Sequence, residues 1–372
     1  MIKKFSRLLT LTILAIFALT ACGESKNTAN STGTDSANLA QEKSEKFVWK
    51  LVTSWPKNFP GLGMAPEKFA KQVHAMSNGR LTVKVYGAGE LVPGFEVFDA
   101  VSQGTVQMGH SGAYYWKGKI PAAPIFSAIP FGMTATEFNA WLHYGGGMEL
   151  WQELYQPFGI KPLPGGNSGA QFGGWFKKEI NSVADLQGLK MRIPGLAGEV
   201  LKNAGAIPVT LTGGEIFSAL QSGAIDATEW VGPYNDLAFG FYQAAEYYYS
   251  SVWHEPGTGL EFLINQQAFD ALPADLQAIV EVAANAVNES TLAEYNARNN
   301  AALKTLLNEH KVQLRQFPDE VMQALKYHTD ELISEQVKAD KDFARVWQSY
   351  SEFLASMREY NKLTLRAYYE NR

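Results

Sequence analysis

The chain has 372 residues, a formal net charge of -5 at pH 7 and a single cysteine. This length suits two domains rather than one. The acidic balance lacks the basic surface on which nucleic-acid binding depends, so nucleic acid is not an expected partner. One cysteine excludes both an intrachain disulfide and a structural zinc site.

The N-terminus has the pattern of an export signal. A basic start precedes an almost wholly apolar run, residues 8–20, which is too short to span a membrane as a helix. The run ends in "LTAC", which resembles a bacterial lipoprotein signal cut before Cys22. We expect residues 1–22 to be this signal and Cys22 to carry a lipid that anchors an exported, periplasmic protein to a membrane. Gly23, where an Asp would favour the inner membrane, hints at the outer membrane if the cell has two.

Residues 23–46 predict a flexible tether between the anchor and the folded part. The segment is rich in Ser, Asn, Thr, Ala and Glu and has no aromatic residue. Such a composition buries too little apolar surface to fold. The globular part is therefore expected to begin near Phe47.

The first elements of the globular part alternate between strands and a helix. "FVWKLVTSW" (residues 47–55) predicts a strand, and "GMAPEKFAKQVHAMS" (residues 63–77) predicts a helix that stops at Asn78-Gly79. "RLTVKVYG" (residues 80–87) alternates apolar and polar residues and predicts a second strand.

Two stretches of the chain resemble each other at an offset of 119 residues. "EVFDAVSQGTVQMG" (residues 96–109) and "EIFSALQSGAIDAT" (residues 215–228) share Glu, Phe, Ala and Gly in place. Each predicts a short amphipathic helix, a glycine stop and a buried strand, with Gly104 and Gly223 at the stops. The spacing suggests two α/β lobes with equivalent parts, although one pair of short segments does not exclude chance similarity.

The second half continues with strands and ends in long helices. "MRIPG", "IPVTLT" and "GLEFLINQQAF" (residues 259–269) predict strands. From Pro273 onward, apolar residues recur at three- and four-residue intervals, which predicts helices. Packing on the lobes explains most of these helices, and their surplus length leaves a homodimer surface open.

A two-lobed α/β protein binds its ligand at the carboxyl ends of its strands, in the crevice between the lobes. The repeat then pairs His110 with Glu229 and Ser111 with Trp230. Both "GHSGAYYW" (residues 109–116) and "TEWVGPY" (residues 228–234) would follow their strands into this crevice.

The stretch from "MRIPGLAGEV" to "DATEWVGPY" (residues 191–234) closely resembles the solute-binding proteins of tripartite ATP-independent periplasmic (TRAP) transporters, the DctP family. "TSWP", "GAGELVPG", "PGGNSGAQFGGWFKKEI" and "YYYSSVWHEPG" extend the resemblance from about Trp49 to beyond Trp253. It is strongest to the branch that binds 2-oxo acids or lactate with a metal ion. The resemblance implies a periplasmic-binding-protein fold, crossing hinge strands and partner membrane subunits of the transporter. One lobe would comprise residues 47–168 and about 256–297, and the other residues 169–255 and about 298–372 with the C-terminal helices.

The resemblance also implies an arginine that clamps the ligand carboxylate, and Arg192 in "KMRIPG" occupies that place. A planar guanidinium grips a carboxylate with two parallel, charge-assisted hydrogen bonds. From the residues alone, a structural salt bridge is the competing interpretation.

The metal ligands implied by the resemblance are Gln171, Glu229, the backbone carbonyl of Trp230, and Glu255. Oxygen donors of this kind suit a hard cation such as Na+ or Ca2+, which would remove the repulsion between two buried carboxylates. The Trp230 ring would form a wall of the pocket. The alternatives are a solvated acid at a strand end for Glu229 and a core aromatic for Trp230.

Tyr114 and Asn167 are further candidates for ligand contacts. Tyr114 lies just past the strand of the first repeat, and Asn167 lies in a glycine-rich segment that would cross between the lobes. Ordinary packing and a turn role explain them equally well.

A hydrolase-type enzyme acting on a small organic acid is the competing function. "GHSGA" (residues 109–113) nearly matches the nucleophile elbow but ends in Ala113 and follows its helix rather than preceding one. The six histidines are scattered singly, with only His110 and His254 near the expected site. A structural or adhesive lipoprotein is a third class, which would show no saturable binding of a small molecule. We therefore expect a receptor without enzymatic activity that captures a small monocarboxylate, either a 2-oxo acid such as pyruvate or lactate.

Overall fold

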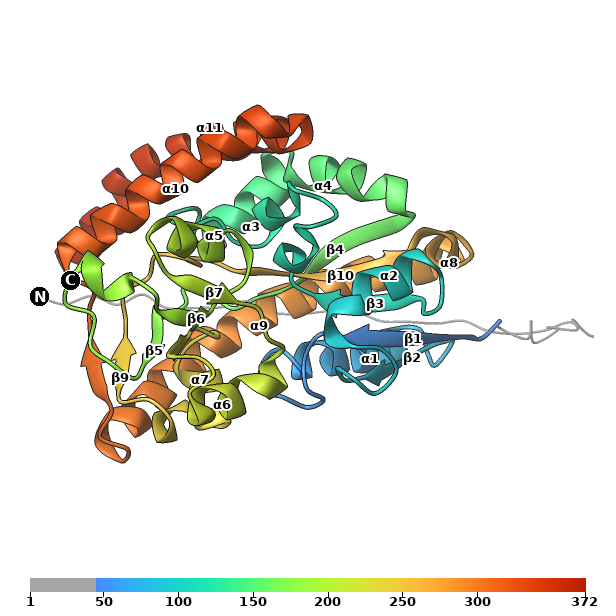
Figure 1. Cartoon of the computed structure of the whole chain (residues 1–372). Coiled ribbons are helices and arrows are strands. Elements are labelled where there is room, and N and C mark those ends of the chain that lie inside the picture. The colour runs from blue at the N-terminus through green and yellow to red at the C-terminus, as the bar shows by residue number, and fades with distance from the viewer. Residues whose placement is uncertain (1–44) are drawn as a thin grey trace, which may run out of the picture. The chain divides into compact units, whose positions relative to one another are not determined.

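The computed structural model describes residues 45–372, so the predicted signal, the predicted lipidation site Cys22 and nearly all of the predicted tether lie outside the described residues. The described chain forms one compact unit built on two separate β-sheets. Figure 1 shows the sheets on opposite sides of the molecule, with helices packed around both. This is the α/β architecture that the strand and helix patterns predict.

The first sheet has five strands in the order β2-β1-β3-β10-β4. Its strands are β2 (Leu81–Tyr86), β1 (Phe47–Thr53), β3 (Met108–Ser111), β10 (Gly259–Asn265) and β4 (Ile160–Asn167). Strand β1 is parallel to β2 and β3, whereas β10 is antiparallel to β3 and β4. Helices α1 (Met64–Met76) and α9 (Ala274–Asn308) pack on this sheet.

The second sheet has six short strands in the order β11-β9-β5-β8-β6-β7. Its strands are β11 (Gln313–Arg315), β9 (Tyr247–Tyr249), β5 (Gly174–Phe176), β8 (Ala227–Thr228), β6 (Lys190–Arg192) and β7 (Ile207–Val209). Strand β6 is parallel to β7 and β8, and β5 is antiparallel to β8 and β9.

The chain crosses between the sheets three times. Two crossings are extended segments, residues 168–173 between β4 and β5 and residues 250–258 between β9 and β10. They run side by side, because the Ser168 amide donates to the Thr258 carbonyl at 3.0 Å and the Gln171 amide donates to the Glu255 carbonyl at 3.0 Å. Helix α9 makes the third crossing and packs on β4 at one side and on α7 (Pro233–Phe239) at the other.

The internal repeat occupies equivalent places in the two sheets. Helix α2 (Val97–Ser102) leads into β3, and α6 (Gly213–Ser222) leads into β8. Gly104 and Gly223, at the two stops, have φ values of 70° and 80°, which only glycine adopts readily. The predicted helix, glycine stop and buried strand are therefore confirmed in both halves.

The predicted C-terminal helices are present, but one predicted strand is too long. The strand expected over residues 259–269 ends at Asn265, whose side chain accepts a hydrogen bond from the Ala268 amide and starts helix α8 (Gln266–Asp270). Long helices then follow: α9, α10 (Asp319–Ala339) and α11 (Lys341–Asn361), which leads through a π-helical turn, Lys362–Arg366, into α12 (Ala367–Glu370). The lobe boundary expected near residue 297 falls inside the continuous helix α9.

Aromatic side chains dominate the core. Six tryptophans are essentially inaccessible to solvent, namely Trp55, Trp116, Trp141, Trp151, Trp175 and Trp253. Trp151 and Trp141 stack on Phe126 beneath α3 (Ala135–Tyr144) and α4 (Gly147–Tyr155). Helices α10 and α11 cover this region and α5 (Gly195–Asn203), as Figure 1 shows at the top of the molecule. Each buried ring contributes about 1.5–3 kcal/mol, so the core accounts for much of the stability.

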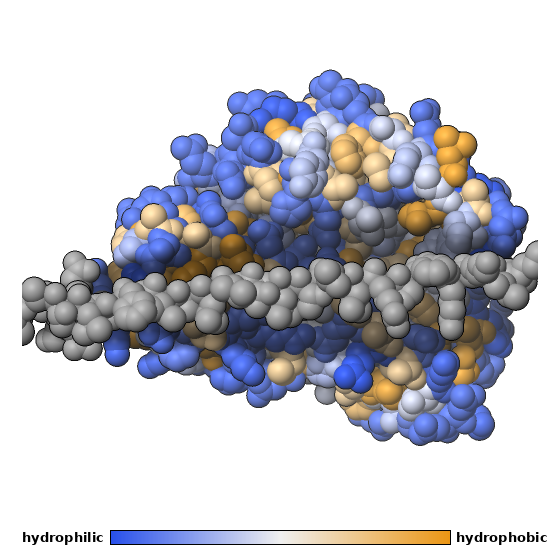
Figure 2. All heavy atoms as spheres, turned by 180° about the vertical axis from the view of Figure 1, so that it is seen from behind, coloured by the Kyte–Doolittle hydropathy of each residue, from blue (hydrophilic) through white to orange (hydrophobic). Residues whose placement is uncertain are grey.

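The outer surface is mostly polar. The visible part of the face in Figure 2 is largely hydrophilic, with apolar residues in separate groups. Within residues 45–372, none of the helices combines the length and the hydrophobicity that a membrane span requires.

Candidate functional site

Two neighbouring strands of the second sheet bring Arg192 and Glu229 together. Arg192 ends β6, and Glu229 follows β8, so the parallel pairing of these strands sets the two residues side by side. The Glu229 amide donates to the Arg192 carbonyl at 3.2 Å. The Arg192 Nη1 atom lies 2.5 Å from Glu229 Oε1 and 3.2 Å from the Glu229 carbonyl oxygen. Both side chains are 1% exposed, so this is a fully buried ion pair.

The guanidinium of Arg192 is held from several further directions. Its Nε donates to the Leu211 carbonyl at 3.2 Å, and its Nη2 donates to the Tyr115 hydroxyl at 3.3 Å. The guanidinium carbon lies 4.9 Å from the centre of the Trp230 ring, within the range of a cation-π contact. The side chain therefore has one defined position.

Glu255 brings a second buried carboxylate to the site from the crossing segment 250–258. Its Oε2 accepts a hydrogen bond from Thr258 Oγ1 at 2.6 Å, and the residue is 4% exposed. Burial raises the pKa of Glu255, and the negative charge of Glu229 raises it further. The charge of Glu229 therefore opposes the ionisation of Glu255 in the protein alone.

Gln171, on the other crossing segment, aims its amide oxygen away from its protein partners. Its Nε2 donates to Ser168 Oγ at 2.9 Å and to Thr258 Oγ1 at 3.0 Å. These bonds fix the amide orientation and leave Oε1 buried without a hydrogen-bond partner, and Glu229 Oε2 is buried without a hydrogen-bond partner too. Most buried polar atoms are hydrogen-bonded, so two orphaned oxygens in one site call for a ligand.

These donors fit a hard cation such as Na+ or Ca2+. Carboxylate and amide oxygens are the ligands that such cations prefer. No group of three or more His, Cys, Asp or Glu side chains able to share an ion occurs within residues 45–372. A cation bound here would therefore need Gln171 and a backbone carbonyl in addition to Glu229 and Glu255.

Trp230 packs as a wall beside the ion pair. It is 5% exposed and contacts Trp55, Phe59 and Phe239 edge to face. These contacts and the guanidinium of Arg192 fix the indole plane. Its place among these rings is also that of a core aromatic, so the role of the ring as a pocket wall stays a prediction.

Tyr114 lies close to the cluster, and Asn167 ends β4, directly before the crossing segment that carries Gln171. Tyr114 is buried in the 3-10 turn η2 (Ala113–Trp116), edge to face with Tyr115 at 4.6 Å between ring centres. Burial raises the pKa of its hydroxyl well above the ordinary value, and the negative charges of Glu255 and Glu229 raise it further. Asn167 Oδ1 accepts from the Gly169 amide at 2.8 Å, which is a turn role, but its buried Nδ2 has no partner.

The structure separates the two histidines near the expected site. His254 is fully buried with both ring nitrogens unpartnered, and its Nε2 lies 3.5 Å from Glu229 Oε2. His110 instead contacts Trp55 Nε1 at 2.8 Å and the Gly165 carbonyl at 2.9 Å. Burial lowers the pKa of His110 to about 4, so its ring is neutral. His254 thus joins the site, whereas His110 is a core residue.

Sequence reasoning gave no site role to Tyr115 or Thr258, although Tyr115 binds Arg192 and Thr258 binds Glu255. Tyr115 shares the "YYW" stretch with Tyr114, and only the turn of η2 decides which hydroxyl reaches Arg192. Thr258 lies three residues beyond Glu255 in "HEPGT", and no periodic pattern marks it.

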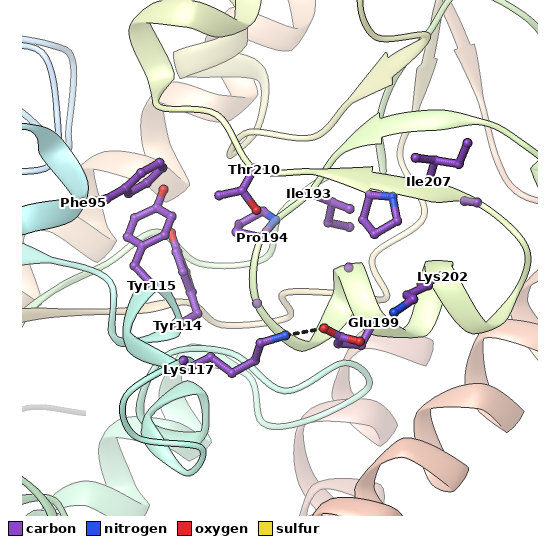
Figure 3. A pocket seen from close by; sticks show the side chains of 15 residues that line it. Phe95, Tyr114, Tyr115, Lys117, Ile193, Pro194, Glu199, Lys202, Ile207 and Thr210 are labelled. Carbon is purple, nitrogen blue, oxygen red and sulfur yellow. Dashed lines mark hydrogen bonds and ion pairs between the residues drawn. The ribbon is translucent and has the colours of Figure 1, made fainter.

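A cavity of about 700 Å³ adjoins the cluster (Figure 3). Tyr114, Tyr115 and Lys117 line it from one side, and Pro194, Glu199 and Thr210 line it from the other. Arg192 and Glu229 do not line this cavity, although Tyr115 contacts both the cavity and Arg192. We therefore locate the site by its buried polar groups and regard the cavity as its vestibule.

The elbow-like "GHSGA" stretch has no catalytic geometry. Ser111 Oγ lies 2.6 Å from Ser54 Oγ, and the ring of His110 is engaged by Trp55 and Gly165. A nucleophilic serine needs a base within hydrogen-bond reach. The partner of Ser111 is another serine, and the ring of His110 is occupied elsewhere.

Comparison with known proteins decides the family. Residues 51–340 match the family of bacterial extracellular solute-binding proteins, family 7, also called DctP. The chain belongs to this family. The predicted recognition is confirmed, and a DctP protein is a binding receptor of a transporter rather than an enzyme, which argues against the hydrolase alternative.

Individual DctP proteins are similar over almost the whole folded part. A monocarboxylate 2-oxoacid-binding periplasmic protein of Nostoc sp. is 43% identical, over 86% of this chain and 87% of its own. TRAP periplasmic solute-binding proteins of Pseudoalteromonas atlantica, with bound sodium and pyruvate, and of Colwellia psychrerythraea, with bound calcium and pyruvate, are each 46% identical. Both superpose with a TM-score of 0.86 over 88% of this chain and all of theirs. The predicted fold is therefore confirmed.

Proposed function

We propose that this protein is the periplasmic receptor of a TRAP transporter and captures a small monocarboxylate together with a metal ion. The ligand is a 2-oxo acid such as pyruvate, or the related 2-hydroxy acid lactate. The observation that carries the proposal is the pair of buried, unpartnered oxygens of Glu229 and Gln171 beside the guanidinium of Arg192. The pyruvate and metal in the two similar TRAP proteins support it.

The proposed metal site consists of Glu229, Glu255, Gln171 and the carbonyl of Trp230, and takes Na+ or Ca2+. When bound, the cation supplies positive charge between two acids that otherwise repel each other. Thr258 orients Glu255 by donating to Oε2, and Ser168 and Thr258 together orient Gln171. These contacts prepare the oxygens before the ion arrives.

The proposed carboxylate clamp is Arg192. Its Nη1 already contacts Glu229 Oε1, and its Nη2 contacts Tyr115. A ligand carboxylate gripped by both nitrogens would replace one of the two contacts that Nη1 makes to Glu229, and displacement of the Oε1 contact would free that oxygen for the cation. The ring of Trp230, the hydroxyl of Tyr114 and the amide of Asn167 would complete the pocket.

The proposed lobes meet at this site. One lobe comprises residues 47–168 and about 256–297, and the other comprises residues 169–255 and about 298–372. Gln171 and Glu255 lie on the crossing segments, so closure around the ligand involves the segments that connect the lobes. A ligand favours the closed form only by as much as it binds that form more tightly, and closure presents one surface to the membrane subunits.

We also propose that Cys22 is lipidated and anchors the exported protein, with residues 23–46 as the tether. The apolar run and "LTAC" support this assignment. A Cys22→Ser variant should leave the membrane fraction of the producing cells and lose the mass of the acyl chains. Persistence in that fraction after a salt wash would contradict the anchor.

The decisive experiment is mass spectrometry of small molecules released from the purified, denatured protein, with elemental analysis of the same sample. We expect a 2-oxo or 2-hydroxy monocarboxylate and about one equivalent of sodium or calcium. An organic ligand without a carboxylate, or a carboxylate without any metal, would overturn the assignment.

A further inference from the structure

Lys117 and Glu199 form an ion pair across the vestibule. The Nζ of Lys117 lies 2.6 Å from Glu199 Oε1, as the dashed line in Figure 3 marks. Lys117 directly follows η2, on the side of the first sheet, and Glu199 lies on α5, which follows β6 of the second sheet. The pair therefore joins elements that belong to different sheets.

Each partner is directly connected to residues of the ligand site. Lys117 follows Tyr114 and Tyr115 on η2, and α5 begins three residues after Arg192. The same two elements approach closely at Gly195, where an added Cβ would lie 3.1 Å from the Cβ of Tyr114. Contacts between η2 and the β6–α5 segment thus run from the partly buried Arg192–Tyr115 hydrogen bond outward to the Lys117–Glu199 pair.

The Lys117–Glu199 pair is exposed enough to solvent to break and re-form. Its side chains are 34% and 38% exposed, so water and salt reach it. The hydrogen bond from Lys117 lowers the pKa of Glu199, which keeps the pair charged at neutral pH. Half-exposed pairs contribute little energy, so a step that breaks this pair is slowed by only a small factor.

We propose that Lys117 and Glu199 are positioning residues that form a latch, which holds η2 against α5 and sets how long the bound ligand stays enclosed. This inference rests on the proposed function, because it assumes that a carboxylate is captured by closure of the two sides. Opening must break the pair, whereas ligand entry takes place before the pair forms. The latch therefore acts on the dissociation rate and leaves the association rate unchanged, so its loss weakens overall binding by the same factor as it speeds dissociation.

The test is the dissociation rate of pyruvate from the full-length protein in Lys117→Gln, Glu199→Gln and the double variant. Rapid dilution of pyruvate-loaded protein, with CaCl2 present, is followed by the fluorescence of buried tryptophans such as Trp230. We expect each single variant to dissociate about two- to five-fold faster, which is the range for a half-exposed pair. The double variant should be no faster than either single one, because the partners act through each other.

Two controls separate the latch from general electrostatics. Lys119→Gln removes the same charge two residues away, but Lys119 pairs with Asp99 on its own side at 3.1 Å, so its dissociation rate should not change. Long-range steering would lower the association rate in Lys117→Gln and raise it in Glu199→Gln, whereas the latch raises dissociation in both. In 1 M salt, where the Debye length is about 3 Å, the variants should approach the wild type.

The outcomes distinguish the two proposals. Wild-type protein that binds pyruvate, together with variants whose dissociation rates are unchanged, would overturn the latch alone. Faster dissociation in Lys119→Gln as well would also overturn it, because the effect would then not depend on a bridge between the two sides. Wild-type protein with no saturable pyruvate signal would overturn the proposed function and the latch with it.

Discussion

At the scale of single residues, the buried pair of Arg192 and Glu229 serves both the fold and the site. Removing one partner of a buried ion pair leaves an uncompensated charge and costs about 3–5 kcal/mol. Truncation of Arg192 would therefore mix loss of binding with loss of stability. A substitution that keeps the charge separates the two effects.

We predict that Arg192→Lys stays folded but binds pyruvate about 10- to 100-fold more weakly. Lysine keeps the positive charge beside Glu229 but lacks the planar fork, so one charge-assisted hydrogen bond of about 1.5–3 kcal/mol is lost. Calorimetric titration at saturating calcium measures the change. Arg345→Lys, on the exposed pair with Glu153, is the matched control. Equal affinity of wild type and Arg192→Lys would remove Arg192 from the clamp.

A second residue-scale prediction concerns the buried carboxyl of Glu261. It accepts hydrogen bonds from Trp116 Nε1 and from the Tyr155 hydroxyl, and burial raises its pKa to about 8 from an ordinary value of 4.5. Between these values the folded protein holds a proton that the unfolded chain has lost. Stability conferred at low pH is therefore lost as the pH rises through this window.

Glu261→Gln should reduce the loss of unfolding free energy between pH 5 and pH 8 by a few kcal/mol. Some loss should persist, because burial also raises the pKa of Asp236 to about 7 and that of Glu255. Urea unfolding at several pH values, in chelator, gives the two curves, with the exposed Glu289→Gln as control. Parallel curves for wild type and Glu261→Gln would show that Glu261 stays ionised in the fold.

At the scale of elements, the sequence predicts the helices and strands that have a periodic pattern of apolar residues. It does not predict the short strands that form only through tertiary contacts. The long helices α9, α10 and α11 and the strand β2 carry clear periodicity and were predicted. Strands β5 and β9 have three residues each, too few for any pattern, and exist because neighbouring strands pair with them. Asn265 ends β10 by a local side-chain bond that the apolar run conceals.

The candidate site shows the same division. The internal repeat predicts that Glu229 and Trp230 lie just after the second buried strand, and they do follow β8. Tyr114 was likewise proposed from its place just past the strand of the first repeat. Arg192, Gln171 and Glu255 came from family resemblance, and the last two lie on the irregular crossing segments 168–173 and 250–258. The partnerships of Gln171, Thr258 and Glu255 depend on the alignment of these segments in space.

The C-terminal helices carry a prediction at the element scale. Beyond Asn361 several large apolar side chains are exposed, among them Leu363 at 82% and Leu365 at 48%. We propose that this segment packs against a second copy of the chain, since clustered exposed apolar residues mark interaction sites. Leu363→Glu combined with Leu365→Glu should shift the protein from dimer to monomer in size-exclusion chromatography with light scattering. Tyr144→Glu, at an isolated position 93% exposed, is the control. A wild-type monomer at all concentrations would contradict the proposal.

At the scale of the whole molecule, the site lies where the two sheets are connected. Gln171 and Glu255 lie on the crossing segments, Arg192 and Glu229 lie on the second sheet, and the first sheet contributes Tyr114 through η2. A ligand that contacts all of them joins both sheets and their connections. This placement explains how a molecule as small as pyruvate would change the relative position of the two sheets.

The central claim is that a trapped cation and the guanidinium of Arg192 together neutralise one small organic acid. Calorimetric titration of pyruvate into protein freed of calcium by chelation, with sodium replaced by a bulky organic cation, tests it most directly. The account predicts no measurable binding until calcium or sodium is added back, and weaker binding of both metal and pyruvate in Glu229→Gln and Glu255→Gln. Pyruvate binding that is equally tight without either metal would contradict it.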